Sequence, residues 1–288
     1  MTANALSVAK RRPALPITKR LRTDICNHNE ADRLCASKTE YKHLTKHRKW
    51  VLAALALIVL LAFCTVPAKT SADVFQTQLD KAGVPYQVPP KGKAILVNIP
   101  AFELIAFDQG VLVLRSRIIV GAPWHRTPRL TTYVSAVRFR PTWRPTPSMV
   151  ASGEYKNRVW PAGKNNPLGL AAVRFQPGLL VYLHDTNHRE KFDQEYRALS
   201  HGCVRVQQWD QLVAFVLGMD LAEVHQLANG RRTFDAPAPP IPVTLGYFLR
   251  FPDAAGQIVE HPDIYRLGHV ENSATQDEAT CQIAGLAD

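Results

Sequence analysis

Residues 93–121 read KAILVNIPAFELIAFDQGVLVLRSRIIVG, and this stretch decides the fold class. It holds three apolar runs, at 94–98, 102–108 and 111–121, which are rich in Val, Ile, Leu and Phe. The turn signals Asn-Ile-Pro and Asp-Gln-Gly separate them. Branched and aromatic residues favour strands, whereas Gly, Pro, Asn and Asp favour turns. The stretch therefore predicts three successive β-strands.

Similar runs continue along the chain. They lie at 131–139, 170–175 and 179–184, with a late run, PIPVTLGYFLRF, at 240–251. Short strands at this spacing predict a compact antiparallel sheet or barrel.

One segment has a helical pattern instead. Between Gln208 and Asn229 the apolar residues keep helical spacing, and Gly230 is a stop signal. The predicted fold class is therefore mainly β, a sandwich or barrel with one or two helices.

Upstream of this domain, residues 50–68 contain no charged residue and include VLAALALIVLLAF. Such a run is long enough to cross a bilayer as a helix. Lys and Arg precede it, which predicts a cytoplasmic N-terminus, a single inner-membrane anchor and an exported remainder. A cleavable signal is the alternative, since 66–68 and 70–72 contain small residues that a signal peptidase accepts. A third alternative is that residues 50–68 form a helix buried in the protein core.

The basic charge is concentrated at the N-terminus. Residues 1–50 hold 12 Lys and Arg against 4 Asp and Glu, and the whole chain of 288 residues has a net charge of +11. Because this excess precedes an apolar run, it indicates membrane topology rather than nucleic-acid binding, with lipid headgroups as another partner. We predict a disordered tail at 1–49, a polar linker at 69–92, a folded domain at 93–266 and a loose tail at 267–288.

The cysteines form neither a metal-type pair nor a dense disulfide framework. They are Cys26, Cys35, Cys64, Cys203 and Cys281. Only Cys203 lies among residues suited to nucleophilic chemistry. Cys281 in the tail could pair with it under oxidation.

The segment LSHGCVR, at 199–205, places His201 two residues before Cys203. In an extended chain these side chains share a face, and an imidazole can convert a thiol into the nucleophilic thiolate. Gly202 leaves room for an incoming carbonyl, and the N–H groups around it could form an oxyanion hole. Ser200 could orient the imidazole.

Two further residues are candidates for the same pocket. Arg205 could bind a carboxylate or brace the loop, and His184, in LHDTN at 183–187, could position substrate or support the thiolate. A zinc site from His184, His201 and Cys203 is conceivable, but the spacing matches no structural zinc pattern. We expect no metal and no cofactor.

The His184 motif followed by SHGCVR resembles the signature of the L,D-transpeptidase catalytic domain, the YkuD-like family. Other segments are similar too, and the resemblance covers about 93–266, closest to the larger murein-remodelling members. These segments are 93–110, RTP at 126–128, PTWRPTPSM at 141–149, AGKNNPLGL at 162–170, 240–251 and HPDIY at 261–265. Between Met149 and Ala162 there is room for only a short flap.

The resemblance implies a β-sandwich with its cysteine in a cleft, working in the periplasm on peptidoglycan stem peptides. Cys203 would attack the carbonyl between the diamino acid at stem position 3 and the D-Ala at position 4. D-Ala would leave, and an amine acceptor would resolve the acyl-enzyme. His201 would be the base, and carbapenem-type β-lactams would be inhibitors. Residues implied for the site are Ser200, Gly202, His184 and Arg205, with Trp143, Tyr182 and Asn187 lining the cleft.

Two other functions stay open at this point. A Cys/His hydrolase or L,D-carboxypeptidase of stem peptides would use the same site with water as the acceptor. A non-catalytic envelope protein could bind peptidoglycan through a degenerate site, although the intact Cys203, His201 and Arg205 argue against degeneracy.

Overall fold

The structure is a computed structural model that describes residues 71–268. The predicted basic tail at 1–49, the predicted membrane helix at 50–68 and nearly all of the predicted C-terminal tail lie outside the described residues. Of the helices within 71–268, none has the length and apolar character needed to cross a membrane.

The first five strands lie where the apolar runs predict them. The described strands are β1 Lys93–Asn98, β2 Glu103–Asp108, β3 Val111–Gly121, β4 Leu130–Phe139, β5 Ala171–Phe175, β6 Tyr182–His184, β7 Ala198–Ser200, β8 Val204–Val206, β9 Phe234–Pro237, β10 Pro242–Gly246, β11 Arg250–Pro252 and β12 Ile258–Glu260. The run at 179–184 yields only the short β6. The run at 240–251 divides into β10 and β11, which belong to different sheets.

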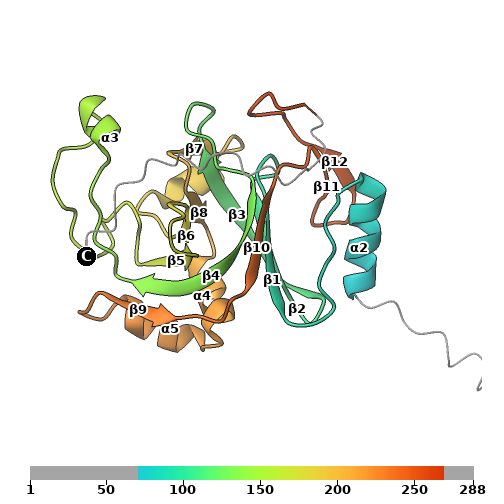
Figure 1. The fold of residues 1–288 in the computed structure, drawn as a ribbon, viewed down its shortest axis with the longest axis horizontal. Coiled ribbons are helices and arrows are strands. Elements are labelled where there is room, and N and C mark those ends of the chain that lie inside the picture. The colour runs from blue at the N-terminus through green and yellow to red at the C-terminus, as the bar shows by residue number, and fades with distance from the viewer. Residues whose placement is uncertain (1–70, 269–288) are drawn as a thin grey trace, which may run out of the picture. The chain divides into compact units, whose positions relative to one another are not determined.

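The strand pairings close on themselves. They run β10-β1-β2-β3-β8-β6-β5-β4, and β4 pairs with β10 again, while β7 and β9 attach to β3 and β4 (Figure 1). The long strands β3 and β4 each belong to two parts of this ring. β3 pairs with β2 through 111–117 and with β8 and β7 through 118–121. The result is the predicted sandwich or barrel.

The prediction of an antiparallel sheet was wrong in part. β1 pairs with β10, β3 with β7 and β6 with β8 in parallel. Parallel neighbours need a long connection between them, so they join strands far apart in sequence. Strand spacing along the chain does not reveal such pairs.

Two clusters of buried side chains lie on opposite faces of β1 and β2. Ile95, Val97 and Leu104 point into the large inner core, whereas Leu96 and Ile105 point into a second cluster on the other face. Successive side chains of a strand alternate between faces. Both strands are therefore apolar throughout because both of their faces are covered.

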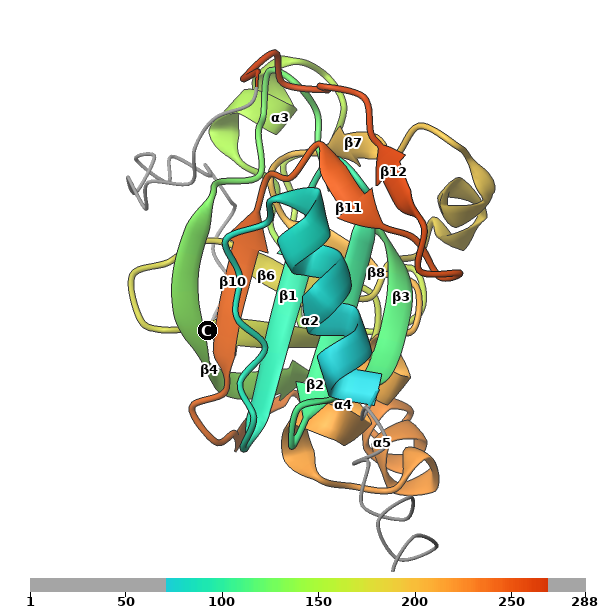
Figure 2. The same ribbon diagram turned by 90° about the vertical axis from the view of Figure 1, so that its right-hand side faces the viewer.

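Helix α2, Ser71–Ala82, covers the second face, so the prediction of a linker at 69–92 was wrong. Figure 2 shows α2 lying across β1 and β2. Its Phe75 and Leu79 are buried against Phe107 and Phe251. Fully burying a side chain of this size stabilises the fold by roughly 1.5–3 kcal/mol.

The predicted helix at 208–229 is two helices, α4 Trp209–Leu217 and α5 Leu221–Ala228. Gly218 ends α4 in the left-handed conformation, with φ of 67°, and its N–H caps the carbonyl of Ala214. With α3, Pro147–Ala151, and the 3₁₀ helix η1, Arg189–Asp193, the described residues hold more helices than the one or two expected.

Candidate active site

Residues 200–205, here called the thiol loop, connect β7 and β8. Both strands pair with the C-terminal end of β3, where Gly121 lies opposite Ser200 and Ile119 opposite Arg205. Gly202 at the tip has φ of 109°, a conformation that side-chain-bearing residues rarely adopt. The loop is thus a sharp reversal held on the rigid strand β3.

The Ser200 side chain, which was expected to orient the His201 imidazole, hydrogen bonds to the backbone of this reversal. Its hydroxyl donates a hydrogen bond to the carbonyl of Cys203 at 2.5 Å and accepts one from the N–H of Gly202 at 3.1 Å. The Gly202 N–H is therefore engaged within the loop in this structure.

The sulfur of Cys203 lies in a small cavity. The residue is 7% exposed. The backbone N–H of Tyr182 donates to Sγ at 3.3 Å, and the carbonyl of Leu180 lies 4.0 Å from Sγ. An N–H aimed at the sulfur favours the negatively charged thiolate. Tyr182 thus contributes through its main chain, whereas the sequence predicted a side chain lining the cleft.

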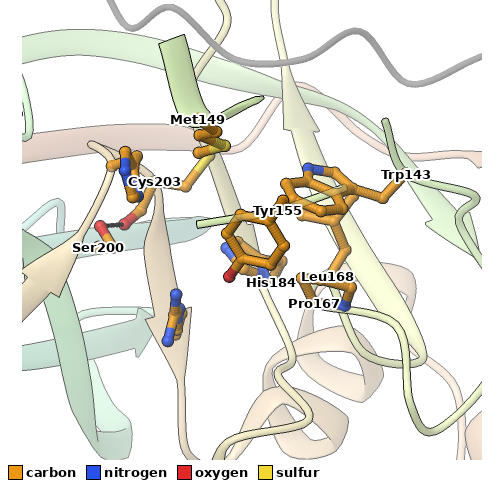
Figure 3. Close-up of a pocket in the computed structure, with 10 residues that line it drawn as sticks. Trp143, Met149, Tyr155, Pro167, Leu168, His184, Ser200 and Cys203 are labelled. Atoms are coloured by element: carbon orange, nitrogen blue, oxygen red, sulfur yellow. Dashed lines mark hydrogen bonds between the residues drawn. The ribbon is translucent and has the colours of Figure 1, made fainter. Parts of the chain in front are cut away.

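This thiol cavity has a volume of about 40 Å³, which is enough to hold water. Figure 3 shows the side chains gathered around it. The predicted residues Trp143, His184, Ser200, His201, Cys203 and Arg205 line it together, with Met149, Tyr155, Pro167 and Leu168. Asn187 is not among the lining residues, and its side-chain amide faces the carbonyl of Asn165 at 3.5 Å.

A flap, residues 147–169, forms much of the cavity wall. It begins with α3, where Thr146 caps the helix by accepting a hydrogen bond from the N–H of Met149. Trp143 packs edge-on against Tyr155, with ring centroids 4.7 Å apart. Asp185 accepts a hydrogen bond from the N–H of Leu170 at 3.0 Å, which fastens the end of the flap to the residue after His184.

His201 is held by a carboxylate on the flap. Its Nε2 lies 3.0 Å from Oε2 of Glu154, and its ring packs on His125 with centroids 4.5 Å apart. Burial lowers the pKa of His201, Glu154 raises it, and His125 and Arg205 lower it again, with a net lowering. The imidazole is therefore neutral near pH 7. When Nε2–H donates to Glu154, Nδ1 is the unprotonated nitrogen of the neutral ring.

His184 is the second imidazole of the cavity. Its Nδ1 lies 2.5 Å from the carbonyl oxygen of Asp185. Burial, followed by the positive charge of Arg205, lowers the pKa of His184 to about 3. It is therefore uncharged over the whole physiological range.

Arg205 carries an unusual guanidinium. Arg205 is 9% exposed. The Nε and Nη1 atoms of its side chain are buried and have no hydrogen-bond partner among the described residues. Burial lowers the pKa of Arg205, while the nearby Tyr155 and Cys203 raise it. A buried cation with unused donors suits an anionic group, either a thiolate or a carboxylate.

A second cavity, of about 390 Å³, lies on the other side of Ser200 and His201. Trp124, which is 78% exposed, and Tyr196 contribute aromatic surface. The full lining is Ala122, Pro123, Trp124, His125, Glu154, Tyr196, Ala198, Leu199, Ser200 and His201. His201 therefore faces both cavities.

Several residues of this arrangement were not predicted, chiefly His125, Glu154, Tyr155 and Asp185. Asp185 follows His184 directly in the motif, so that spacing was a usable signal. His125 and Glu154 lie in loops far from the thiol loop in sequence. Only the folding of the flap and of the β3–β4 connection brings them to His201.

Comparisons with known proteins agree with this geometry. A Haemophilus influenzae protein described as "Putative L,D-transpeptidase" is 27% identical over 69% of this chain and 50% of its own length. The Escherichia coli K12 protein "Probable L,D-transpeptidase YbiS" is 33% identical over 46% of each chain. The chain thus spans about half the length of these curated relatives.

Solved structures show a more distant likeness. An L,D-transpeptidase from Mycobacterium smegmatis has 16% identity and a TM-score of 0.36, covering 54% of this chain and 58% of that one. The catalytic domain of an Enterococcus faecium L,D-transpeptidase acylated by ertapenem has 17% identity and a TM-score of 0.33, covering 54% and 98%.

The family of L,D-transpeptidase catalytic domains, YkuD, matches residues 92–236. That range is half of the chain and holds every residue that lines the thiol cavity. This chain therefore belongs to the L,D-transpeptidase catalytic-domain family.

Proposed function

We propose that the chain is an L,D-transpeptidase acting on peptidoglycan stem peptides through a thioester at Cys203. One observation carries the proposal: Sγ of Cys203 receives the N–H of Tyr182 inside a cavity that also holds two neutral imidazoles and the buried Arg205. These are the parts of a cysteine acyltransferase, a nucleophile with a neighbouring base and a cation. Membership of the family supports the choice of substrate.

In the first half-reaction the thiol proton moves to the imidazole of His201, and the thiolate attacks the carbonyl carbon between stem positions 3 and 4. The C–N bond then breaks, and the departing D-Ala amine takes the proton from His201. The products are free D-Ala and a thioester on Cys203. In the second half-reaction an acceptor amine attacks the thioester, loses a proton to His201, and the C–S bond breaks to regenerate the thiol.

The two cavities suit two substrates. Arg205 supplies unused donors for a stem-peptide carboxylate in the thiol cavity. The second cavity opens toward the same imidazole, with the Glu154 carboxylate beside it for an ammonium group. The flap residues Met149 and Tyr155 line the thiol cavity, so a bound donor peptide would contact them.

His184 is a second candidate for the base. Its Nδ1 contacts the Asp185 carbonyl, which leaves Nε2 as the acceptor in the neutral ring. Its pKa of about 3 makes it a weak base. The pH dependence separates the two, because a rate that falls only near pH 3 would identify His184.

Incubation of the full-length protein with tetrapeptide muropeptides tests the proposal. We expect release of D-Ala, cross-linked products, and an acyl adduct on Cys203 visible by intact-protein mass spectrometry. Cys203→Ser should lose nearly all turnover, because a serine hydroxyl ionises far less readily than a thiol. Absence of both D-Ala release and adduct in the wild-type protein would refute it.

The same assay separates the alternatives. A hydrolase or carboxypeptidase would give the same products with and without an acceptor amine, whereas a transpeptidase gives cross-linked mass only with one. A non-catalytic peptidoglycan-binding protein would bind the muropeptides without forming an adduct. Carbapenem-type β-lactams should add one inhibitor mass at Cys203.

We also propose that the protein is located in the cell envelope. The apolar run at 50–68 would anchor the chain in the inner membrane, with the basic residues inside and the thiol cavity in the periplasm. Fractionation, with protease added to spheroplasts, tests this: the folded domain should be digested from outside while an N-terminal tag is protected.

A further inference from the structure

A residue beyond the family-matched range 92–236 is connected to the thiol loop through hydrogen bonds. Tyr265, which is 2% exposed, points its hydroxyl at the end of β3. This hydroxyl donates to the carbonyl of Gly121 at 2.6 Å and accepts the N–H of Thr127 at 3.1 Å. A residue outside the matched range is therefore hydrogen bonded to the loop that follows β3.

Thr127 continues the chain of hydrogen bonds to the site. Its hydroxyl accepts the N–H of Gly121 at 2.8 Å and donates to the carbonyl of Gly202 at 2.9 Å. A hydroxyl has one proton to donate. Since each of the two hydroxyls donates once and accepts once, the bonds from Tyr265 through Thr127 to Gly202 are mutually consistent.

Tyr265 is itself firmly held. Its N–H donates to the hydroxyl of Tyr247 at 2.8 Å, and the two rings stack with centroids 5.5 Å apart. The Tyr247 hydroxyl in turn donates to Asp263 at 2.6 Å. Buried polar groups that are all satisfied make a rigid network.

The tip of the loop has a conformation that residues with a side chain rarely adopt. Gly202 has φ of 109°, its N–H is bound by Ser200 and its carbonyl by Thr127. Gly121 allows the supporting loop to approach closely, since a Cβ there would lie 2.0 Å from the carbonyl oxygen of His125. The peptide that carries Cys203 is thus fixed from both sides.

We propose that Tyr265 and Thr127 are positioning residues for Cys203, acting through the carbonyl of Gly202. The inference rests on the proposed cysteine acyl transfer. Removing the Tyr265 hydroxyl frees the N–H of Thr127, lets the threonine side chain shift, and releases Gly202. Small displacements of a nucleophile reduce the rate of chemistry far more than they reduce binding.

Tyr265→Phe in the full-length protein tests this, with Tyr86→Phe as a matched control. Tyr86 belongs to the second cluster, under α2, away from the thiol loop. We expect Tyr265→Phe to slow carbapenem acylation and to lower kcat by about tenfold, with KM nearly unchanged. Tyr86→Phe should leave acylation at the wild-type rate even if both variants lose a similar amount of thermal stability.

A series at Thr127 gives an independent readout. Thr127→Val removes the hydroxyl and should slow acylation at least as much as Tyr265→Phe, whereas Thr127→Ser keeps the hydroxyl and should restore most of the rate. The double variant with Tyr265→Phe and Thr127→Val should be no slower than Thr127→Val alone, because both changes break one pathway.

The inference would be overturned if Tyr265→Phe were acylated at the wild-type rate. It would also be overturned if the double variant were slower than Thr127→Val by the full factor that Tyr265→Phe causes alone. If Thr127→Val does not fold, Tyr265→Phe and Thr127→Ser still decide it. A wild-type protein that forms no adduct at Cys203 would instead refute the proposed function, so the two failures are distinguishable.

Discussion

At the residue scale, the environment of Cys203 is assembled from distant parts of the chain. Sγ receives the N–H of Tyr182 on β6, and the electrostatic field at the sulfur includes Arg205 on β8. His201 depends on Glu154 for its orientation. The environment of the cysteine thus depends on three separate segments, which are the thiol loop, β6 and the flap, and not on the SHGCVR string alone.

Glu154→Gln should alter the pH dependence of acylation. The Glu154 carboxylate raises the pKa of His201, so its removal lowers that pKa further below its ordinary value. Because the neutral imidazole is the active form, the acid limb of the rate profile should move to lower pH. The plateau rate should also fall, since His201 loses the group that fixes its tautomer.

The measurement is the rate of carbapenem acylation at pH values from about 4 to about 8, at intervals of about half a pH unit. This range spans the ordinary pKa values of imidazole groups. Glu195→Gln, at an exposed position, serves as the control. An acid limb that stays in place or moves to higher pH in Glu154→Gln would contradict the assignment of His201 as the base.

His184 should make the folded state sensitive to acid. Its pKa is about 3 when folded and about 6.5 when unfolded. Between these values the unfolded chain binds a proton that the folded one does not, so stability falls as pH falls. From pH 7 to pH 5 this residue alone should remove about 2 kcal/mol from the free energy of unfolding.

Urea unfolding of the wild-type protein and of His184→Gln at both pH values measures this contribution. The variant should be less stable at pH 7 but should lose about 2 kcal/mol less on acidification. Equal losses in the two proteins would show that His184 does not remain neutral in the folded state.

At the scale of the elements, α2 and the flap have opposite roles. α2 covers the outer face of β1 and β2 with apolar side chains and stabilises the sheet. The flap covers the thiol cavity with Trp143 at its base and Tyr155 within it, and it touches the catalytic groups through Glu154. One element therefore packs on the sheet, and the other lines the thiol cavity.

Leu79→Ala should test whether α2 is part of the folded domain. Leu79 is fully buried, so the variant should lose about 2–5 kcal/mol in the free energy of unfolding. Val74→Ala is the matched control, because Val74 lies on the same helix but is 45% exposed. Chemical denaturation monitored by circular dichroism gives both values. Similar small losses at the two positions would mean that α2 does not pack as described.

At the scale of the whole described domain, β10 closes the ring of strands. It pairs in parallel with β1 and antiparallel with β4, and its Val243 and Leu245 are buried in the inner core. β10 lies beyond the family-matched range 92–236. Without it, β1 and β4 would each expose an unpaired edge and the core would open.

A fragment limited to 92–236 should therefore fail to fold, whereas 71–268 should fold cooperatively. Thermal unfolding followed by circular dichroism, with dispersion of amide signals by NMR, compares the two. A cooperative transition in the shorter fragment at a temperature close to that of the longer one would contradict this role of β10.

The candidate site was predictable to the extent that it is local in sequence. Cys203, His201, Arg205 and His184 were recognisable by chemistry and spacing, and the structure places all four around one cavity. The role of Ser200 was not, because its hydroxyl turns back to the carbonyl of Cys203. Hydrogen-bond direction inside a tight loop depends on backbone angles that residue types alone do not specify.

Strands β1 to β5 can be recognised from the amino-acid sequence, because runs of branched and aromatic residues between turn signals need no distant contact to be recognised. The sequence also identified Cys203 as the candidate nucleophile, with His201 beside it. Only the tertiary structure decided which strands pair in parallel, that α2 is a packed helix, and that Glu154 and Thr127 reach the thiol loop. These features depend on contacts between residues far apart in sequence, whereas the periodicity of a segment depends only on residues close together in sequence.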